Sequence, residues 1–182
     1  MKRRHVILAV VAVAAGTVAG YGVLRNTAVG RSEAVQAGGN ASAGVGDVPD
    51  ALWALTLPDL DGTAQSMAQW RGKRTVVNFW ATWCAPCVKE MPDLDALAKK
   101  HENVKFVGIG IDSTANIRAF HAKVPVAYPL IVFETGGVDM LRQLGNTQGG
   151  LPFTLILDEE GRIMHRVLGQ IDAQDLDKRL SA

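Results

Sequence analysis

The chain has 182 residues, of which 48% are hydrophobic and 20% are charged. This balance excludes a wholly disordered chain and leaves room for one domain of ordinary size plus an additional segment. The 19 basic and 18 acidic residues give a formal net charge of +1, so there is no basic excess for binding nucleic acid through its phosphates.

Residues 1–25 have the features of a transmembrane anchor. Three basic residues at positions 2–4 precede an uncharged run, residues 6–24. As a helix this run would be about 28 Å long, close to the roughly 30 Å hydrocarbon core of a bilayer. The basic residues predict a cytoplasmic N-terminus and place the rest of the chain on the outer face of a bacterial inner membrane, in the periplasm or its equivalent. The alternative is a signal peptide cleaved after residues 35–37, although the apolar region of such peptides is only about 7–15 residues long.

Residues 26–50 are rich in glycine, alanine, serine and valine and contain few large apolar side chains. This composition predicts a flexible linker. Such a linker would let the remaining segment, residues 51–182, reach partners near the membrane surface. The alternative is a spacer whose length has no functional meaning.

The segment after the linker opens with a predicted β-hairpin. Within residues 52–67, short apolar stretches flank an aspartate–glycine pair at positions 61–62, which is typical of a hairpin turn. Residues 75–80 are β-branched and aromatic for the most part, which predicts a buried strand. A helix is predicted from residue 86 to about residue 101. Pro92 lies inside it and should introduce a kink.

The remainder of the chain alternates between strands and helices. The predicted strands after the first are residues 104–111, 128–133, 153–157 and 163–168, the last two forming an antiparallel hairpin. The predicted helices are residues 115–122, 138–144 and 173–180. This order predicts an α/β fold in which helices cover both faces of a mixed sheet.

Cys84 and Cys87 are the only cysteines in the chain. A disulfide that closes so short a loop removes less unfolded-state entropy than one that closes a long loop, so it is a weak structural staple. Cys84 falls where the predicted helix begins, and the unpaired N–H groups and the dipole there favour its thiolate. Cys87, one turn later, is placed to attack a mixed disulfide and release the product. Pro86 fits the first turn, where a missing N–H costs little. The pattern predicts thiol–disulfide exchange.

A metal carrier is the alternative from a different functional class, because two thiolates suit copper or zinc. The cysteine pair supplies only two ligands. None of the four histidines has ligand spacing to it: His5, His101, His121 and His165. We therefore expect neither a metal nor an organic cofactor, since the cysteine pair itself carries two electrons. A zinc titration of the reduced protein would separate the two hypotheses.

The string from Asn78 to Pro92 closely resembles the thioredoxin superfamily, and within it the membrane-anchored TlpA/ResA-like thiol–disulfide reductases. The likeness extends over residues 51–182, including the predicted hairpin and the segment Gly-Gly-Leu-Pro-Phe-Thr at 149–154. It implies a thioredoxin fold, with a mixed central sheet flanked by helices and an N-terminal β-hairpin. Residues 113–133 resemble the central helix–strand insert of this group.

The resemblance also implies roles for residues far from the cysteines. It identifies Pro152 as a cis-proline facing the active site, whereas from composition alone Pro152 reads as a proline at a strand entrance. The backbone of Leu151 would then pair with an extended segment of the substrate. Trp83 is expected to form an apolar rim for docking partner proteins, and Trp80 is expected in the core.

Glu90 is the candidate for handling the proton that Cys87 loses when it attacks. It lies one helical turn beyond Cys87 and matches an acidic residue characteristic of the TlpA/ResA-like group. Thioredoxin itself carries a buried aspartate where this chain has Asn78, which cannot ionise. The alternative for Glu90 is an ordinary acid in an early helical turn that complements the dipole.

The predicted function is reduction, or reversible exchange, of disulfides in exported proteins. The direction is open, because related scaffolds span roughly −270 to −120 mV. The resemblance implies a transmembrane thiol protein as electron donor. Narrower options are cytochrome c maturation, whose dedicated relatives often carry glutamate where this chain has Phe153, and reduction of a copper-site assembly protein. A non-enzymatic option is a tethered binding module that has kept the fold.

Overall fold

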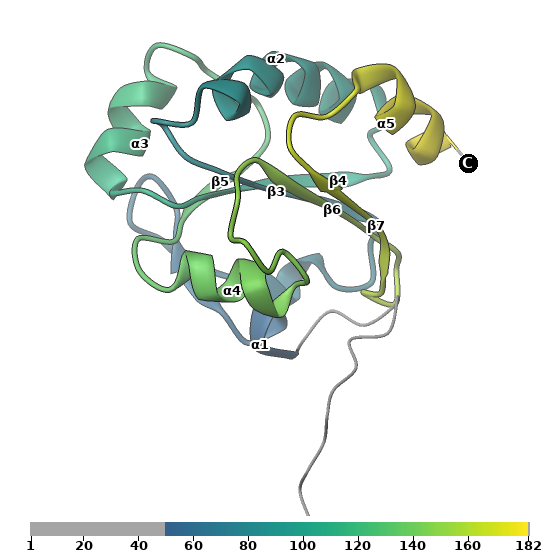
Figure 1. Cartoon of the computed structure of the whole chain (residues 1–182), viewed down its shortest axis with the longest axis horizontal. Coiled ribbons are helices and arrows are strands. Elements are labelled where there is room, and N and C mark those ends of the chain that lie inside the picture. The colour runs from purple at the N-terminus through teal and green to yellow at the C-terminus, as the bar shows by residue number, and fades with distance from the viewer. Residues whose placement is uncertain (1–49, 182) are drawn as a thin grey trace, which may run out of the picture. The chain divides into compact units, whose positions relative to one another are not determined.

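The computed structural model describes residues 50–181 (Figure 1). The predicted membrane anchor (1–25), the alternative cleavage site and all but the last residue of the predicted linker (26–50) lie outside the described residues. Within residues 50–181, no helix combines the length and apolar character needed to span a bilayer.

A five-stranded mixed sheet forms the centre of the fold, in the order β5-β4-β3-β6-β7. The central strand β3 (Thr75–Trp80) runs parallel to β4 (Lys105–Gly110) and antiparallel to β6 (Phe153–Leu157). The edge strands are β5 (Leu130–Val132), parallel to β4, and β7 (Ile163–Leu168), antiparallel to β6. The thioredoxin-type sheet expected from the sequence is confirmed.

Helices cover both faces of this sheet (Figure 1). One face carries α2 (Ala85–Lys100), α3 (Thr114–His121) and α5 (Ala173–Ser181), and the other carries α1 (Asp50–Trp53) and α4 (Gly137–Gln143). Each predicted helix is present with bounds that differ by a few residues at most. Pro92 lies on the exposed side of α2, and the helix continues past it to Lys100.

A two-stranded hairpin precedes the sheet, as predicted. Strands β1 (Thr56–Pro58) and β2 (Ala64–Ser66) pair antiparallel, and a short 3-10 helix, η1 (Met67–Trp70), follows. The turn between β1 and β2 contains Gly62 at a φ of +86°, a conformation that glycine adopts without strain. A single bridge between Asp59 and Ile131 joins this hairpin to the edge strand β5.

Side chains along β3 point alternately to the two faces of the sheet, and the core forms one cluster on each face. Val77 and Phe79 pack in the cluster with residues of α1 and α4, while Val76 and Trp80 pack in the cluster with residues of α2, α3 and α5. Because side chains alternate along a strand, Asn78 faces the α2 side with Val76 and Trp80. This places a buried polar side chain beneath the helix that carries the cysteines.

Candidate active site

The two cysteines lie at the junction between β3 and α2 and form a disulfide. Cys84 is the N-cap of α2, and its Sγ accepts a hydrogen bond from the backbone N–H of Cys87 at 3.3 Å. Pro86 sits in the first turn of the helix, as predicted. The first turn of a helix presents unpaired N–H groups and the positive end of its dipole, and both favour negative charge on the capping sulfur.

Exposure distinguishes the two sulfur-bearing residues. Cys84 is 6% exposed, whereas Cys87 is fully buried at 0%. Trp83, directly before Cys84, is 71% exposed and therefore contributes apolar surface beside the disulfide. Trp80 is buried, as predicted, and its ring packs against Phe120 with centroids 5.2 Å apart. A partner molecule therefore meets Trp83 and Cys84 before it can reach Cys87.

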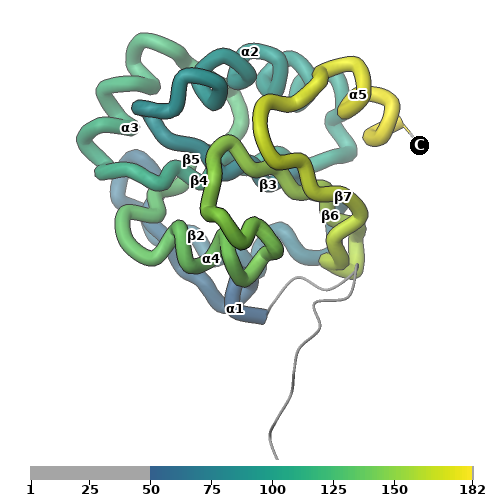
Figure 2. The backbone as a smooth tube through the Cα atoms, in the orientation of Figure 1, coloured from purple at the N-terminus to yellow at the C-terminus, as the bar shows by residue number. Residues whose placement is uncertain are grey.

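The Leu151–Pro152 peptide bond is cis, so this prediction is confirmed. The loop that carries it connects α4 to β6 and rises toward the end of the sheet where α2 begins (Figure 2). Pro152 is buried, and its carbonyl accepts a hydrogen bond from Gly169 N–H at 2.9 Å. Leu151 is half-buried and packs against the cluster that contains both cysteines. The structure thus brings Leu151 and Pro152 to the same region as Cys84 and Cys87.

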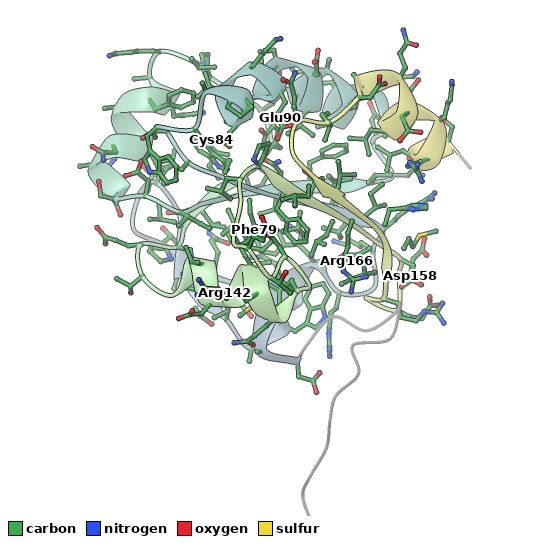
Figure 3. The ribbon with its side chains drawn as sticks, in the orientation of Figure 1. Phe79, Cys84, Glu90, Arg142, Asp158 and Arg166 are labelled. Carbon is green, nitrogen blue, oxygen red and sulfur yellow. A yellow bond between two sulfur atoms is a disulfide. The ribbon has the colours of Figure 1, made fainter. Side chains whose placement is uncertain are left out.

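Glu90 points from α2 into the interior, and its side chain is fully buried (Figure 3). Its Oε1 accepts a hydrogen bond from Asn78 Nδ2 at 2.8 Å, and its Oε2 accepts one from the backbone N–H of Ile171 at 2.8 Å. Burial raises the pKa of Glu90 above its ordinary value of 4.5, and the two hydrogen bonds only partly offset this effect. A buried carboxyl whose pKa is raised can bind and release a proton closer to neutral pH.

Asn78 extends the Glu90 network to a third element. Its Nδ2 also donates to Thr154 Oγ1, on β6, at 3.0 Å. Thr154 is fully buried and lies two residues after the cis-proline. Sequence reasoning missed this residue, although a lone hydroxyl within the apolar strand 153–157 was a signal that it needs a polar partner.

A second group of hydrogen bonds holds the segment just before Cys84. The carboxylate of Asp112, directly after β4, accepts from the hydroxyl of Thr82, from Asn116 Nδ2 at 2.7 Å and from Ser113 N–H at 2.7 Å. Partial burial acts to raise the pKa of Asp112, but these hydrogen bonds outweigh it and lower the pKa below its ordinary value. Sequence reasoning did not identify Asp112 or Thr82 as neighbours, because no local pattern links positions 30 residues apart.

The comparison with protein families matches residues 44–180 to the family described as Redoxin. The chain belongs to the Redoxin family. Its curated relatives include the thiol-disulfide oxidoreductase ResA of Geobacillus thermodenitrificans, 28% identical over 134 residues that cover 70% of this chain and 73% of ResA. Another is the thioredoxin-like protein YneN of Bacillus subtilis, 29% identical over 132 residues that cover 69% and 74% of the two chains.

Solved structures of similar proteins support the same grouping. A thioredoxin-related protein from Neisseria meningitidis serogroup B is 34% identical, with a TM-score of 0.61 and coverage of 69% of this chain and 96% of that one. A DsbF homologue from Corynebacterium diphtheriae is 28% identical, with a TM-score of 0.60 and coverage of 70% and 82%.

Together these matches show that the chain is a TlpA/ResA-like member of the thioredoxin superfamily. They also show that it is a thiol–disulfide oxidoreductase. The expected absence of a metal or an organic cofactor stays a prediction. Within residues 50–181, histidine, cysteine, aspartate and glutamate side chains do not gather in groups of three or more that could hold a metal ion.

Proposed function

We propose that the chain is a membrane-anchored reductase that transfers electrons from Cys84 and Cys87 to disulfides in exported proteins. The observation that carries this proposal is the unequal exposure of the pair at the start of α2. Cys84 is 6% exposed and caps the helix, while Cys87 is fully buried. This arrangement supports Cys84 as the attacking residue and Cys87 as the resolving residue.

The reaction begins with both cysteines reduced. The Cys84 thiolate attacks one sulfur of a substrate disulfide, forming a mixed disulfide and releasing the first substrate sulfur as a thiolate. The Cys87 sulfur then attacks Cys84, the mixed disulfide breaks, and the second substrate sulfur leaves as a thiolate. Two electrons have passed to the substrate, and the enzyme holds the Cys84–Cys87 disulfide seen in the structure.

Glu90 is the proposed acceptor of the proton that Cys87 loses in the second step. It lies one helical turn beyond Cys87, and its raised pKa suits a group that takes and returns a proton. After the substrate leaves, the proton passes from Glu90 to the released thiolate or to solvent. Replacement by glutamine should alter the pH dependence of exchange while the chain stays folded. An unchanged pH profile would remove Glu90 from the mechanism.

The proposed docking site for the substrate consists of Trp83, Pro86, Leu151 and Pro152. Trp83 supplies exposed apolar surface, and Leu151 packs against the cluster that contains both cysteines, which supports a role for its backbone in docking. An extended substrate segment could pair with this backbone as an added strand. Such binding reads main-chain geometry rather than one sequence, which suits an enzyme with several protein substrates.

The proposed location is the outer face of a bacterial inner membrane. The support is the basic triplet at 2–4 followed by the uncharged run 6–24, whose length matches a bilayer. In an oxidising compartment the pair must be reduced again after each turnover, so we propose a transmembrane thiol protein as electron donor. No metal or organic cofactor is needed in this scheme.

Reduction of insulin by the full-length chain tests the proposed activity. The wild type, recharged by a chemical dithiol, should accelerate insulin reduction, and Cys84→Ser should abolish the acceleration. Cys87→Ser should instead accumulate an insulin adduct on Cys84. If wild type and Cys84→Ser are equally inert, the chain is a binding module that has kept the fold.

A further inference from the structure

The side chain of Asn78 makes unequal use of its two polar atoms. Nδ2 donates to Glu90 Oε1 at 2.8 Å and to Thr154 Oγ1 at 3.0 Å. The carbonyl atom, Oδ1, is buried and has no hydrogen-bond partner among the described residues. Leaving a buried acceptor unpaired is costly, so another interaction must hold the amide in this orientation.

The ionised carboxylate of Glu90 provides that interaction. A carboxylate can only accept hydrogen bonds, and here one oxygen faces Asn78 while the other faces the N–H of Ile171. Turning the amide over would place Oδ1 against a negatively charged oxygen. The amino group therefore faces Glu90 for as long as Glu90 carries its charge, and Oδ1 stays unpaired as a consequence.

When Glu90 is neutral, the opposite orientation of the Asn78 amide is favoured. One of its oxygens must then donate a hydrogen bond, and the N–H of Ile171 already occupies Oε2, so the proton rests on Oε1. With the amide unchanged, this O–H would point at the Nδ2 donor of Asn78. Turning the amide by 180° lets Oδ1 accept from Glu90, while Nδ2 moves to the place that Oδ1 leaves, where the described residues offer no partner. The Thr154 hydroxyl can then change from acceptor to donor toward the same Oδ1.

We propose that Asn78 is a positioning residue whose amide turns over each time Glu90 gains or loses a proton, with the Thr154 hydroxyl reversing its role in step. This inference rests on the proposed function of Glu90 as proton acceptor. When Cys87 attacks Cys84, the proton of its S–H group passes to Oε1 of Glu90, and the electron pair of the broken mixed disulfide leaves with the substrate sulfur. The turned amide stabilises the neutral carboxyl until that proton departs.

The groups around Glu90 allow the turning of the Asn78 amide to be measured as Glu90 titrates. Asn78 on β3, Thr154 on β6 and the backbone N–H of Ile171 before α5 do not titrate. The titratable groups whose charges interact with Glu90 are Asp93 on α2 and Tyr128 before β5, besides Cys87 in the reduced chain. The pKa of Tyr128 is raised far above neutrality, mainly by burial, so its hydroxyl stays neutral between pH 4 and 9.

Nuclear magnetic resonance of the oxidised full-length chain in detergent, with ¹⁵N in asparagine only, tests the inference. We expect both amide protons of Asn78 to move upfield as the pH falls, because the bonds from Nδ2 to Glu90 and Thr154 are lost. Their midpoint should match that of the ¹³C carboxyl signal of Glu90. If Glu90 titrates while both protons keep their positions, the amide does not turn and the inference is wrong.

Three substitutions separate a turning amide from a simple response to charge. In Glu90→Gln, the Gln carbonyl accepts from Ile171 and its amino group faces Asn78, so the Asn78 amide should hold the turned position at every pH. In Thr154→Val, only the proton facing Glu90 should respond to pH, and Thr154→Ser should restore the response of both. An Asn78 signal that stays in the high-pH position in Glu90→Gln would overturn the inference.

The kinetic result distinguishes this inference from the proposed function. If Glu90→Gln leaves the pH profile of insulin reduction unchanged, Glu90 is not the proton acceptor. The turning of the Asn78 amide, even if it is observed, then has no role in catalysis. If the profile changes but the amide stays fixed in the wild type, Glu90 keeps its proposed role. Asn78 is then only a static hydrogen-bond donor.

Discussion

Replacing Glu90 by glutamine is expected to make the folded chain more stable at neutral pH even though it slows exchange. Glu90 is fully buried, and burial raises its pKa above the ordinary value of 4.5. Between 4.5 and the raised pKa, the folded chain holds more protons on this group than the unfolded chain does. The free energy of unfolding of the wild type therefore falls as the pH rises through this window.

The size of the effect follows from this proton difference. One proton of difference corresponds to a slope of at most about 1.4 kcal/mol per pH unit, and the slope vanishes outside the window. Glutamine does not titrate, so the difference in unfolding free energy between Glu90→Gln and the wild type should widen with that slope and then level off. Below the window both side chains are neutral, and the difference should be within about 1 kcal/mol, the contribution of a typical hydrogen bond.

Urea denaturation of both oxidised full-length proteins from pH 4 to pH 8 measures this difference, because the contributions of the other groups largely cancel. Glu134→Gln is the matched control: Glu134 is exposed, and removal of its carboxyl should change stability by no more than about 0.5 kcal/mol at any pH. A difference for Glu90→Gln that is independent of pH, or that narrows as the pH rises, would refute the argument that burial controls this carboxyl.

Three further predictions concern packing, docking and the direction of exchange. A Cβ at Gly110 would collide with Cδ1 of Ile117, so Gly110→Ala should lower the free energy of unfolding by about 1–3 kcal/mol in urea denaturation, and Ile117→Val should restore part of it. Trp83→Ala should change stability by less than about 0.5 kcal/mol but raise the KM for insulin, since Trp83 is 71% exposed; an unchanged KM would remove it from docking. The disulfide joins residues only three positions apart, so the free energy of unfolding in urea should be about 2 kcal/mol higher for the oxidised chain than for the reduced chain. A more stable reduced chain would indicate an oxidant rather than a reductase.

The fold was predictable from the sequence because its main elements carry strong local patterns. The apolar run of β3 and the position of the cysteine pair fixed the strand–helix junction, and the thioredoxin resemblance predicted the cis bond at Pro152. The short helices α1 and η1 were not predicted, since four residues carry too little periodicity to indicate a helix.

The polar network was only partly predictable. Glu90 was identified through the resemblance, but its backbone partner Ile171 lies 81 residues further along the chain, and tertiary packing decides such a pairing. Asn78 was interpreted only as a residue that cannot ionise. Its contact with Thr154 shows that two polar residues within apolar strands were a usable signal, because strands that pair must also satisfy each other's buried polar groups.

Capture of mixed disulfides in cells tests the central claim most directly. In the full-length Cys87→Ala variant, Cys84 can attack a substrate but nothing resolves the adduct, so substrates should stay covalently attached. We expect adducts that dithiothreitol releases, that mass spectrometry maps to Cys84, and whose attached proteins are exported ones. A variant lacking both cysteines should yield none. If Cys87→Ala captures no more protein than this control, the chain does not reduce protein disulfides through Cys84.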